Sequence, residues 1–422
     1  MGHVVIAPDK FKGSLTAAEV AAHAAAGLRR AAPGVETVEL PVADGGEGTV
    51  DAAVAAGFTR VEAEVTGPVA GSRVTAAFGL RDGTAVIEAA QACGLSLLRS
   101  MAGGELAPLA ATSRGVGELI ARAASAGARR IVLGLGGVAT NDGGAGMAQA
   151  LGVRLLDDAD AELPPGGAAL ARLARIALPD PAMLASSAAP PSPAPSSDAP
   201  PTAAPPSPIP DISALSGIEV LIASDVDNPL LGPNGAAAVY GPQKGASPGD
   251  VRILDAALAR WADVAEEMAD ELTAPGAVAR AREARVRDVP GAGAAGGLGF
   301  GALLFLRATP RPGIELLLDM LGFAGHLDGA ALVITGEGSL DEQTLRGKAP
   351  AGVARAAAAR RPPVPVVAVS GACSLSGTEL RAAGISAAYA LTSIEPDVTR
   401  CIAEAGPLTE RLSARLAADW IR

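Results

Sequence analysis

The chain has 422 residues, of which 49% are hydrophobic and 2% aromatic, and its formal net charge is -11 at pH 7. This length exceeds the size at which one hydrophobic core usually stops growing, so we expect two domains. The acidic balance, the scarcity of aromatic stacking platforms and the lack of a Lys and Arg cluster argue against nucleic-acid binding, which depends on neutralising phosphates.

The first residues of the chain and the spacing of its cysteines indicate where in the cell the protein is expected. Residues 3–10 lack the basic start and long apolar run of a signal peptide, and no later stretch is long and uncharged enough to span a bilayer. The 3 cysteines and 3 histidines are too far apart to predict a disulfide framework or a zinc site. We therefore expect a soluble cytoplasmic protein with no membrane partner, whose cysteines are small buried hydrophobic residues.

Apolar runs alternate with helical sequence along the chain. Residues 3–8 form the first run, and Thr16 with Glu19 predicts a capping box at the start of an Ala-rich helix that reaches Arg30. A second strand is expected over residues 37–43. Later runs predict strands over residues 131–135, 220–223, 331–335 and 364–369. The alternation indicates an α/β fold with largely parallel sheets.

The segment 179–210 interrupts this pattern, because it holds roughly a third of the 33 prolines, interleaved with Ala and Ser. Proline fixes φ and lacks an amide donor, so we expect a flexible, polyproline-like segment outside any core. Both flanks look globular, which favours an insertion in a surface loop. A linker between domains is the alternative.

Polar loops follow several predicted strands, and in such sheets ligands bind beyond the carboxyl ends of the strands. After residues 3–8, Lys10 and Lys12 could hold phosphate next to Asp9, while Ser14 could lie at a helix start. A solvated loop with a capping hydroxyl is the alternative. After residues 37–43, Asp44 precedes two glycines, where a general base or an acceptor for a substrate hydroxyl would be placed.

Two later loops combine glycines with acidic and amide side chains. Asn141 and Asp142 lie within the glycine-rich run 134–146, which predicts a ligand cradle, with tight strand-to-helix packing as the alternative. The loop 224–245 offers oxygen ligands for Mg²⁺ and then a cation for phosphate, although an Asx-turn explains some of these residues. Its candidate residues are Asp225, Asp227, Asn228 and Lys244.

Two nucleotide-binding patterns fit poorly. Residues 291–296 match the dinucleotide fingerprint, with Glu315 or Asp319 near the expected downstream distance. The charged residues 285–289 before it do not predict a strand, so a hydride-transfer enzyme is only a minor alternative. Residues 338–348 fail as a Walker A loop, because Glu342 replaces the first glycine and Ala349 replaces Ser or Thr.

Taken together, the ordered segments 7–15, 41–49, 134–152, 224–245, 291–299 and 335–350 resemble the glycerate kinase type 1 family. The resemblance covers nearly the whole chain apart from 179–210. It implies ATP-dependent phosphorylation of D-glycerate, with 2-phosphoglycerate as the expected product and Mg²⁺ assisting. It also implies a discontinuous flavodoxin-like (Rossmann-like) three-layer α/β domain, residues 1–67 and 288–422, into which an α/β domain of different topology, residues 68–287, is inserted.

Within this hypothesis, phosphoryl transfer needs positioning and charge neutralisation. Asp44 or Asp142 accepts the hydroxyl proton, and Lys12 and Lys244 face phosphate. The family often has Ser where this chain has Lys10, so Lys12 is the better candidate cation. The residues expected to bind Mg²⁺ are Asp225 and Asp227. Those expected to bind the nucleotide are Gly293, Gly296, Gly297, Glu337 and Asp341, of which the last two could equally bind metal. Those expected to bind substrate are Ser14, Asn141 and Asn228.

Other activities stay open at this point. A glycerate 3-kinase or a kinase of a related small hydroxy acid would share these motifs. A dinucleotide-dependent oxidoreductase would bind NAD at residues 291–296, and a noncatalytic sugar-acid sensor would not need several acidic loops. The sequence does not fix which hydroxyl is phosphorylated. No heptad or aromatic stripe marks an interface, so a monomer and a homodimer are both compatible with it.

Overall fold

The computed structural model describes residues 2–101, 104–179, 212–272, 285–345 and 347–421. The chain divides into two compact units. The first unit comprises Met1–Val61, Ile222–Asp225 and Pro310–Arg422, and the second comprises Glu62–Leu221 and Val226–Thr309. Of the Pro-rich insertion expected over 179–210, all but Pro179 lies outside the described residues. In the described ranges, no helix has the length and apolar character needed to cross a membrane.

The first unit is built on a five-stranded parallel sheet in the order β13-β12-β11-β1-β2. Its strands are β1 (His3–Pro8), β2 (Thr37–Glu39), β11 (Ala330–Leu340), β12 (Val366–Cys373) and β13 (Ala387–Ala390). Numbered along the chain, this order is the 2-1-3-4-5 order of flavodoxin-like sheets. The point where the strand order reverses therefore lies between β1 and β11.

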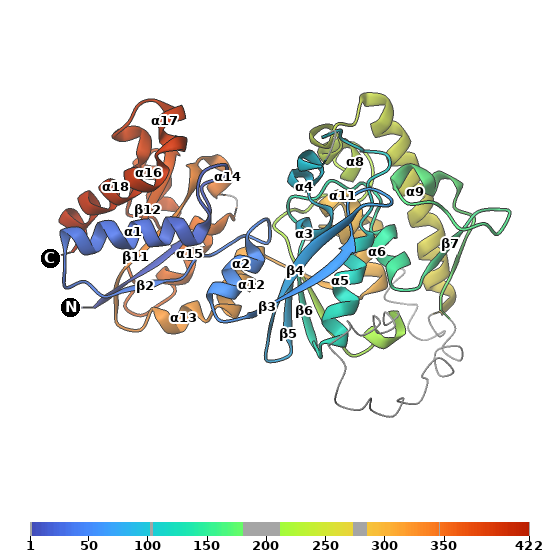
Figure 1. Ribbon diagram of the computed structural model, residues 1–422, viewed down its shortest axis with the longest axis horizontal. Helices are drawn as coiled ribbons and strands as arrows, with labels where there is room; N and C mark the ends of the chain where they lie inside the picture. The colour runs from blue at the N-terminus through green and yellow to red at the C-terminus, as the bar shows by residue number, and fades with distance from the viewer. Residues whose placement is uncertain (1, 102–103, 180–211, 273–284, 346, 422) are drawn as a thin grey trace, which may run out of the picture. The chain divides into compact units, whose positions relative to one another are not determined.

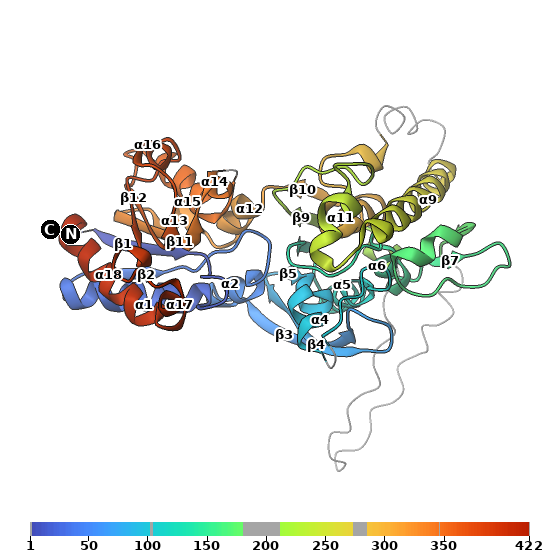
Figure 2. The same ribbon diagram turned by 90° about the horizontal axis from the view of Figure 1, so that it is seen from above.

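Alternate residues of these strands enter two separate cores, because successive side chains of a strand point to opposite faces. Val4 and Ile6 pack with α1 (Ala17–Ala31) and α18 (Ala405–Trp420) on one face. Val5 and Ala7 pack with α12 (Gly313–Met320), α13 (Phe323–His326) and α15 (Ala349–Ala358) on the other. Figure 1 shows α1 beside α18, and Figure 2 shows the helices on both sides of the strands. The first unit is thus a three-layer structure.

Four shorter helices complete the first unit: α2 (Thr49–Ala55), α14 (Glu342–Leu345), α16 (Gly377–Ala382) and α17 (Val398–Ala403). The expected capping box at Thr16 is confirmed, since its side chain accepts from the Glu19 amide and the Glu19 carboxylate accepts from the Thr16 amide. The second strand is shorter than expected and ends at Glu39. Residues 40–42 stay hydrogen-bonded to β1, through Leu40 N to Ile6 O and Val42 N to Pro8 O.

The second unit contains most of a six-stranded mixed sheet in the order β10-β9-β6-β5-β4-β3. Its strands are β3 (Thr59–Thr66), β4 (Arg73–Arg81), β5 (Thr84–Glu88), β6 (Arg130–Gly134), β9 (Glu219–Ala223) and β10 (Thr309–Arg311). The β5 and β6 strands are parallel, whereas β4 and β5 are antiparallel. A separate antiparallel pair is formed by β7 (Arg154–Leu156) and β8 (Arg175–Ala177). The expected α/β class is confirmed, with more antiparallel pairing than the sequence predicts.

Four helices of the second unit bury a core around Trp261, whose ring stacks on Phe305 at a centroid distance of 5.4 Å: α6 (Ala145–Ala150), α8 (Ala236–Tyr240), α9 (Pro248–Leu272) and α11 (Ala294–Phe305). The unit also contains α3 (Ala90–Cys93), α4 (Leu95–Ser100) and α5 (Arg114–Ser125). Short 3-10 helices of this unit are η1 (Gly167–Arg172), η2 (Ile212–Leu215), η3 (Pro242–Lys244) and η4 (Val286–Asp288), while η5 (Leu391–Ser393) belongs to the first unit. Trp261 Nε1 donates to the carbonyl oxygen of Gly143 at 3.0 Å, which ties α9 to the loop before α6.

Candidate active site

Asp9 directly follows β1 and is buried, with 7% of its surface exposed. Its backbone amide donates to Gly336 O at 2.8 Å, which continues the pairing between β1 and β11. Its Oδ1 accepts from the Lys10 amide at 2.7 Å and lies 3.7 Å from Lys10 Nζ. Burial raises the pKa of Asp9 to about 6, while Lys10 lowers it and the charges of Asp44 and Glu337 add to the rise. Asp9 is thus a buried carboxyl group close to two others.

Glu337 lies in β11 beside the loop that carries Asp341. The Thr344 hydroxyl accepts from the Asp341 amide at 3.0 Å and donates to Glu337 Oε1 at 2.5 Å. Lys348 Nζ lies 3.7 Å from Glu337 Oε2. Burial raises the pKa of Glu337, and the Thr344 and Lys348 contacts oppose that rise. The structure therefore brings the predicted residues Glu337 and Asp341 together.

The other predicted residues of the first unit lie on loops. Asp44 is partly buried, and its Oδ1 accepts from the Gly46 amide at 3.2 Å. Asp225 is exposed, and its Oδ1 accepts from the Gly313 amide at 3.0 Å. Lys12 is exposed, whereas Ser14 donates to Phe11 O at 3.1 Å within a tight turn. Ser14 therefore serves the local turn, and the capping residue of α1 is Thr16.

Lys244 is a buried cation in the second unit, with 2% of its surface exposed. Its Nζ donates to Thr140 O at 2.6 Å and lies 3.4 Å from Asn141 Oδ1. Asn141 is fully buried, and its amide nitrogen donates to Pro108 O at 3.3 Å. Burial lowers the pKa of Lys244 to about 8, an effect that Cys93 and Asp142 oppose. The predicted residues Asn141 and Lys244 are therefore neighbours.

Asp142 is buried at the starts of two helices, where amide groups lack partners within the helix. Its Oδ2 accepts from the Ser113 amide at 2.8 Å, the Ser113 hydroxyl at 2.9 Å and the Gly146 amide at 3.2 Å. Its Oδ1 accepts from the Gly144 amide at 3.2 Å. Burial raises the pKa of Asp142, and these donors oppose the rise. The carboxylate thus joins the starts of α5 and α6.

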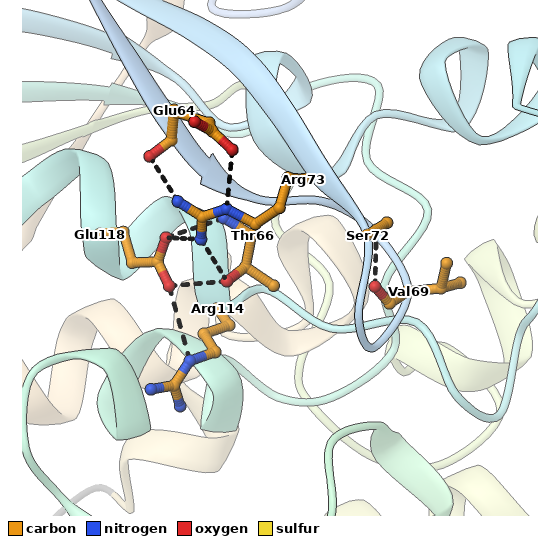
Figure 3. Close-up of polar contacts among 7 residues, drawn as sticks. All are labelled: Glu64, Thr66, Val69, Ser72, Arg73, Arg114 and Glu118. Carbon is orange, nitrogen blue, oxygen red and sulfur yellow. Dashed lines mark hydrogen bonds and ion pairs between the residues drawn. The ribbon is translucent and has the colours of Figure 1, made fainter.

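A network around Glu118 fixes α5 against the β3–β4 hairpin (Figure 3). Glu118 accepts from the Thr66 amide at 2.8 Å and from the Thr66 hydroxyl at 2.7 Å. Arg73 Nη1 and Arg114 Nε lie 3.4 and 3.5 Å from its carboxylate oxygens. Near the start of α5, the Thr112 amide donates to Pro68 O of the hairpin turn at 2.9 Å. The hairpin therefore supports the segment that holds Asp142.

The predicted glycines of the fingerprint contact backbone atoms of the second unit. A Cβ on Gly293 would lie 2.1 Å from Pro229 O, and one on Gly296 would lie 1.9 Å from Thr140 O and 2.8 Å from Lys244 Nζ. Gly296 and Gly297 have φ of 69° and 85° and interrupt α11. The 3-10 helix η4 precedes this segment, rather than the strand that a dinucleotide fingerprint requires. The absence of side chains here permits close packing against the loop that carries Asn141.

The two predicted metal ligands lie in different units. Asp225 belongs to the first, whereas Asp227 is exposed in the second, where its charge contributes to a raised pKa of the half-buried Tyr240. Burial is the larger cause of that rise. Asn228 accepts from the Tyr240 hydroxyl at 2.5 Å and donates to Asn234 O at 2.9 Å. In the part of the chain that the structure describes, no group of three His, Cys, Asp or Glu side chains is arranged to hold a metal ion.

Sequence reasoning did not select several residues that these contacts make prominent. The sequence shows Asp9 as an acidic residue after a strand. It does not show that the residue is buried, because the burial depends on neighbouring strands. Thr344 and Lys348 lie within residues 338–348, where the sequence singled out only Asp341. Ser113 carried no motif of its own, and its role arises from packing of α5 against Asp142.

A model of the glycerate kinase family matches residues 4–186 and 211–421 of this chain. A glycerate kinase of Bacillus subtilis (strain 168) is 41% identical over 99% of this chain and 97% of its own. The glycerate 2-kinase of Escherichia coli (strain K12) is 41% identical over 93% of this chain and 91% of its own.

A solved structure supports the same relationship. It is the crystal structure of a protein proposed to be glycerate kinase 2 from Salmonella typhimurium LT2, with a TM-score of 0.74 and 38% identity. The match covers 99% of this chain and 98% of that one. The family model and these near full-length relatives together show that this chain belongs to the glycerate kinase family.

Proposed function

We propose that this protein uses ATP to phosphorylate D-glycerate and that its product is 2-phosphoglycerate. The observation that carries this proposal is the near full-length similarity to proteins named glycerate kinase, one of them a glycerate 2-kinase. A kinase transfers the γ-phosphoryl group to an alcohol, so the protein must bind an anionic donor and an anionic sugar acid. Within the glycerate kinases we place it in the type 1 group on the motifs described above.

Buried Lys244 supports the binding of a phosphorylated donor. A buried ammonium group is costly unless an anion compensates it. Within the described residues Lys244 has only neutral oxygens as hydrogen-bond partners, on Thr140 and Asn141. A phosphate oxygen of ATP would add a directly bonded anion to the nearby charge of Asp142. We therefore keep Lys244 as a phosphate-binding residue, with exposed Lys12 as a second candidate on the first unit.

In this proposal the glycines at 293, 296 and 297 help to position the residues that bind ATP. Gly296 allows the segment before Leu298 to approach Thr140 and Lys244 closely, because any Cβ would overlap Thr140 O. Gly293 and Gly297 pack in the same manner on Pro229 and Gly143. Glu337 and Asp341 remain proposed ligands of the nucleotide, and Asn141 and Asn228 of the substrate.

Mg²⁺ is compatible with the residues present, although three protein ligands do not come together among the described residues. Mg²⁺ usually takes one or two carboxylates and completes its coordination with water and substrate phosphates. Asp225 and Asp227 are exposed carboxylates suited to this role. When bound, the ion would neutralise charge on the phosphates.

We also propose a correspondence between the compact units and the domains expected from the sequence. The first unit would be the discontinuous flavodoxin-like domain expected over residues 1–67 and 288–422, and the second the inserted domain expected over 68–287. The bounds differ, because residues 62–67 and 288–309 belong to the second unit and residues 222–225 to the first. The 2-1-3-4-5 strand order of the first unit supports this assignment. Limited proteolysis followed by mass spectrometry tests it, because cleavage should concentrate near the proposed boundaries.

Phosphorus NMR of the products tests the proposed reaction. The protein is mixed with ATP, Mg²⁺ and D-glycerate, and a second sample omits glycerate. A glycerate-dependent 2-phosphoglycerate signal is expected. A 3-phosphoglycerate signal would preserve the kinase and overturn the choice of hydroxyl. Folded protein that forms no glycerate-dependent product would contradict the function itself.

A further inference from the structure

Three polar side chains occupy corresponding positions on neighbouring strands of the first unit. Pro8 of β1 pairs with Gly336 of β11, so Asp9 and Glu337 follow side by side. Glu337 pairs in turn with Ser370 of β12. These positions lie toward the carboxyl ends of the strands, and β1 and β11 flank the point where the strand order reverses. Ligands of open α/β sheets bind at such points.

The three side chains share one face of the sheet. Residues 5 and 7 of β1, 333 of β11, and 366 and 368 of β12 all enter the core formed with α12 and α15. Because side chains alternate along a strand, Asp9, Glu337 and Ser370 continue on that same face. The N-terminal end of α15 lies there too, since its capping residue Lys348 contacts Glu337. A helix start and a lysine make this edge suitable for an anionic ligand.

Ser370 gives independent support for a polar ligand at this edge. Its hydroxyl is fully buried and has no hydrogen-bond partner among the residues that the structure describes. Buried hydroxyl groups nearly always have a partner, because an unsatisfied one loses its hydration without compensation. The residue aligned with it, Glu337, already accepts from Thr344. A polar molecule bound at the row of Asp9, Glu337 and Ser370 would give this hydroxyl a partner.

Asp9 is the member of this row best able to take up a proton. Its Oδ1 accepts from the Lys10 amide, and within the described residues no hydrogen bond reaches Oδ2. Asp142, in contrast, accepts from four donors, and Glu337 is engaged by Thr344 and Lys348. A general base works best when its pKa lies near the working pH. Burial places the pKa of Asp9 at about 6, with Lys10, Asp44 and Glu337 as the charged groups facing it.

We infer that Asp9 is the catalytic residue that accepts the proton of the glycerate hydroxyl during its phosphorylation, an inference that rests on the proposed function. The hydroxyl oxygen forms a bond to the γ-phosphorus, and the bond between that phosphorus and the bridging oxygen breaks. The electron pair of the broken bond stays on ADP. The hydroxyl proton passes to Oδ2 of Asp9 and is later released to water. In this assignment Asp44 contacts the substrate or acts through its charge, which raises the pKa of Asp9.

Steady-state kinetics of Asp9→Asn test this inference. We expect kcat to fall by about 10²- to 10⁴-fold, the usual contribution of a general base, with KM values for ATP and glycerate changed less than about threefold. Asp51→Asn is the matched control, because Asp51 is exposed in the same unit and pairs with Arg60. Its kinetics should equal those of the wild type. A kcat of Asp9→Asn within about fivefold of the wild type, or a loss confined to KM, would overturn the assignment.

The pH profile of the wild type gives a test that needs no variant. Since the base must be deprotonated, kcat should rise with pH through an apparent pKa of about 6. The residual activity of Asp9→Asn should lack this acid limb. A wild-type profile that is flat between pH 5 and 7 would overturn the assignment. If the wild type forms no phosphoglycerate, the proposed function fails, whereas an active wild type with a fully active Asp9→Asn refutes only the role of Asp9.

Discussion

Replacing Asp9 by Asn should stabilise the protein at neutral pH even though it removes activity. The folded protein holds the pKa of this carboxyl at about 6, against an ordinary value of 3.8. A shift of roughly two units corresponds to about 3 kcal/mol. Because the folded state binds this proton more tightly than the unfolded chain, the free energy of unfolding falls as pH rises from about 4 to about 6. Neutral Asn avoids that loss and still offers an oxygen to the Lys10 amide.

Urea unfolding of wild type and Asp9→Asn at several pH values between 4 and 8 measures this effect. At pH 7.5 the variant should be more stable by up to about 3 kcal/mol, and the difference should disappear near pH 4, where both side chains are uncharged. The control Asp51→Asn should show no comparable gain, because Asp51 is exposed. A variant that is less stable than the wild type at pH 7.5, or a difference that does not depend on pH, would refute the reasoning.

Three further substitutions test the second unit. Lys244→Met replaces a buried charge by an apolar side chain of similar length, so the fold and its circular dichroism should not change. The KM for ATP should rise at least about tenfold. An unchanged KM would argue against phosphate binding. Gly296→Ala should cost at least about 2 kcal/mol more in urea unfolding than Gly127→Ala, since both have positive φ but only Gly296 meets a backbone oxygen within 2 Å of a Cβ. Glu118→Ala should cost about 2–3 kcal/mol by leaving the Thr66 amide unpaired, whereas loss of the partly exposed Arg114 should cost under about 1 kcal/mol; equal losses would contradict this difference.

Because both faces of that sheet are covered, the sequence predicts β1, β2, β11 and β12 of the first unit, but not β13. Buried parallel strands read as continuous apolar runs, as in residues 3–8 and 331–335. The hairpin of β3 and β4 escapes this criterion. Its first strand carries charged residues such as Arg60, Glu62 and Glu64 at alternating positions that stay at least partly exposed. A search for apolar runs cannot find a strand with one face in water.

Glycine patterns predict the candidate loops but not what approaches each glycine. The family resemblance implies a nucleotide near Gly293, Gly296 and Gly297, whereas the space beside each one holds backbone or side-chain atoms of the chain itself. A glycine that admits a phosphate and a glycine that admits another loop look identical in sequence. Only the three-dimensional contacts distinguish them, and here those contacts bring a glycine segment to Lys244.

The hydrogen-bond donors around a buried carboxylate affect whether it serves structure or chemistry. Asp142 lies in a more glycine-rich motif than Asp9 does, yet it accepts four hydrogen bonds at the starts of α5 and α6. Such donors stabilise the charged form and reduce its tendency to accept a proton. Asp9 gains its surroundings from strands more than 300 residues further along the chain, through the pairing of Pro8 with Gly336. Local motifs therefore identify which residues to consider, while the register of the parallel sheet brings Asp9 beside Glu337.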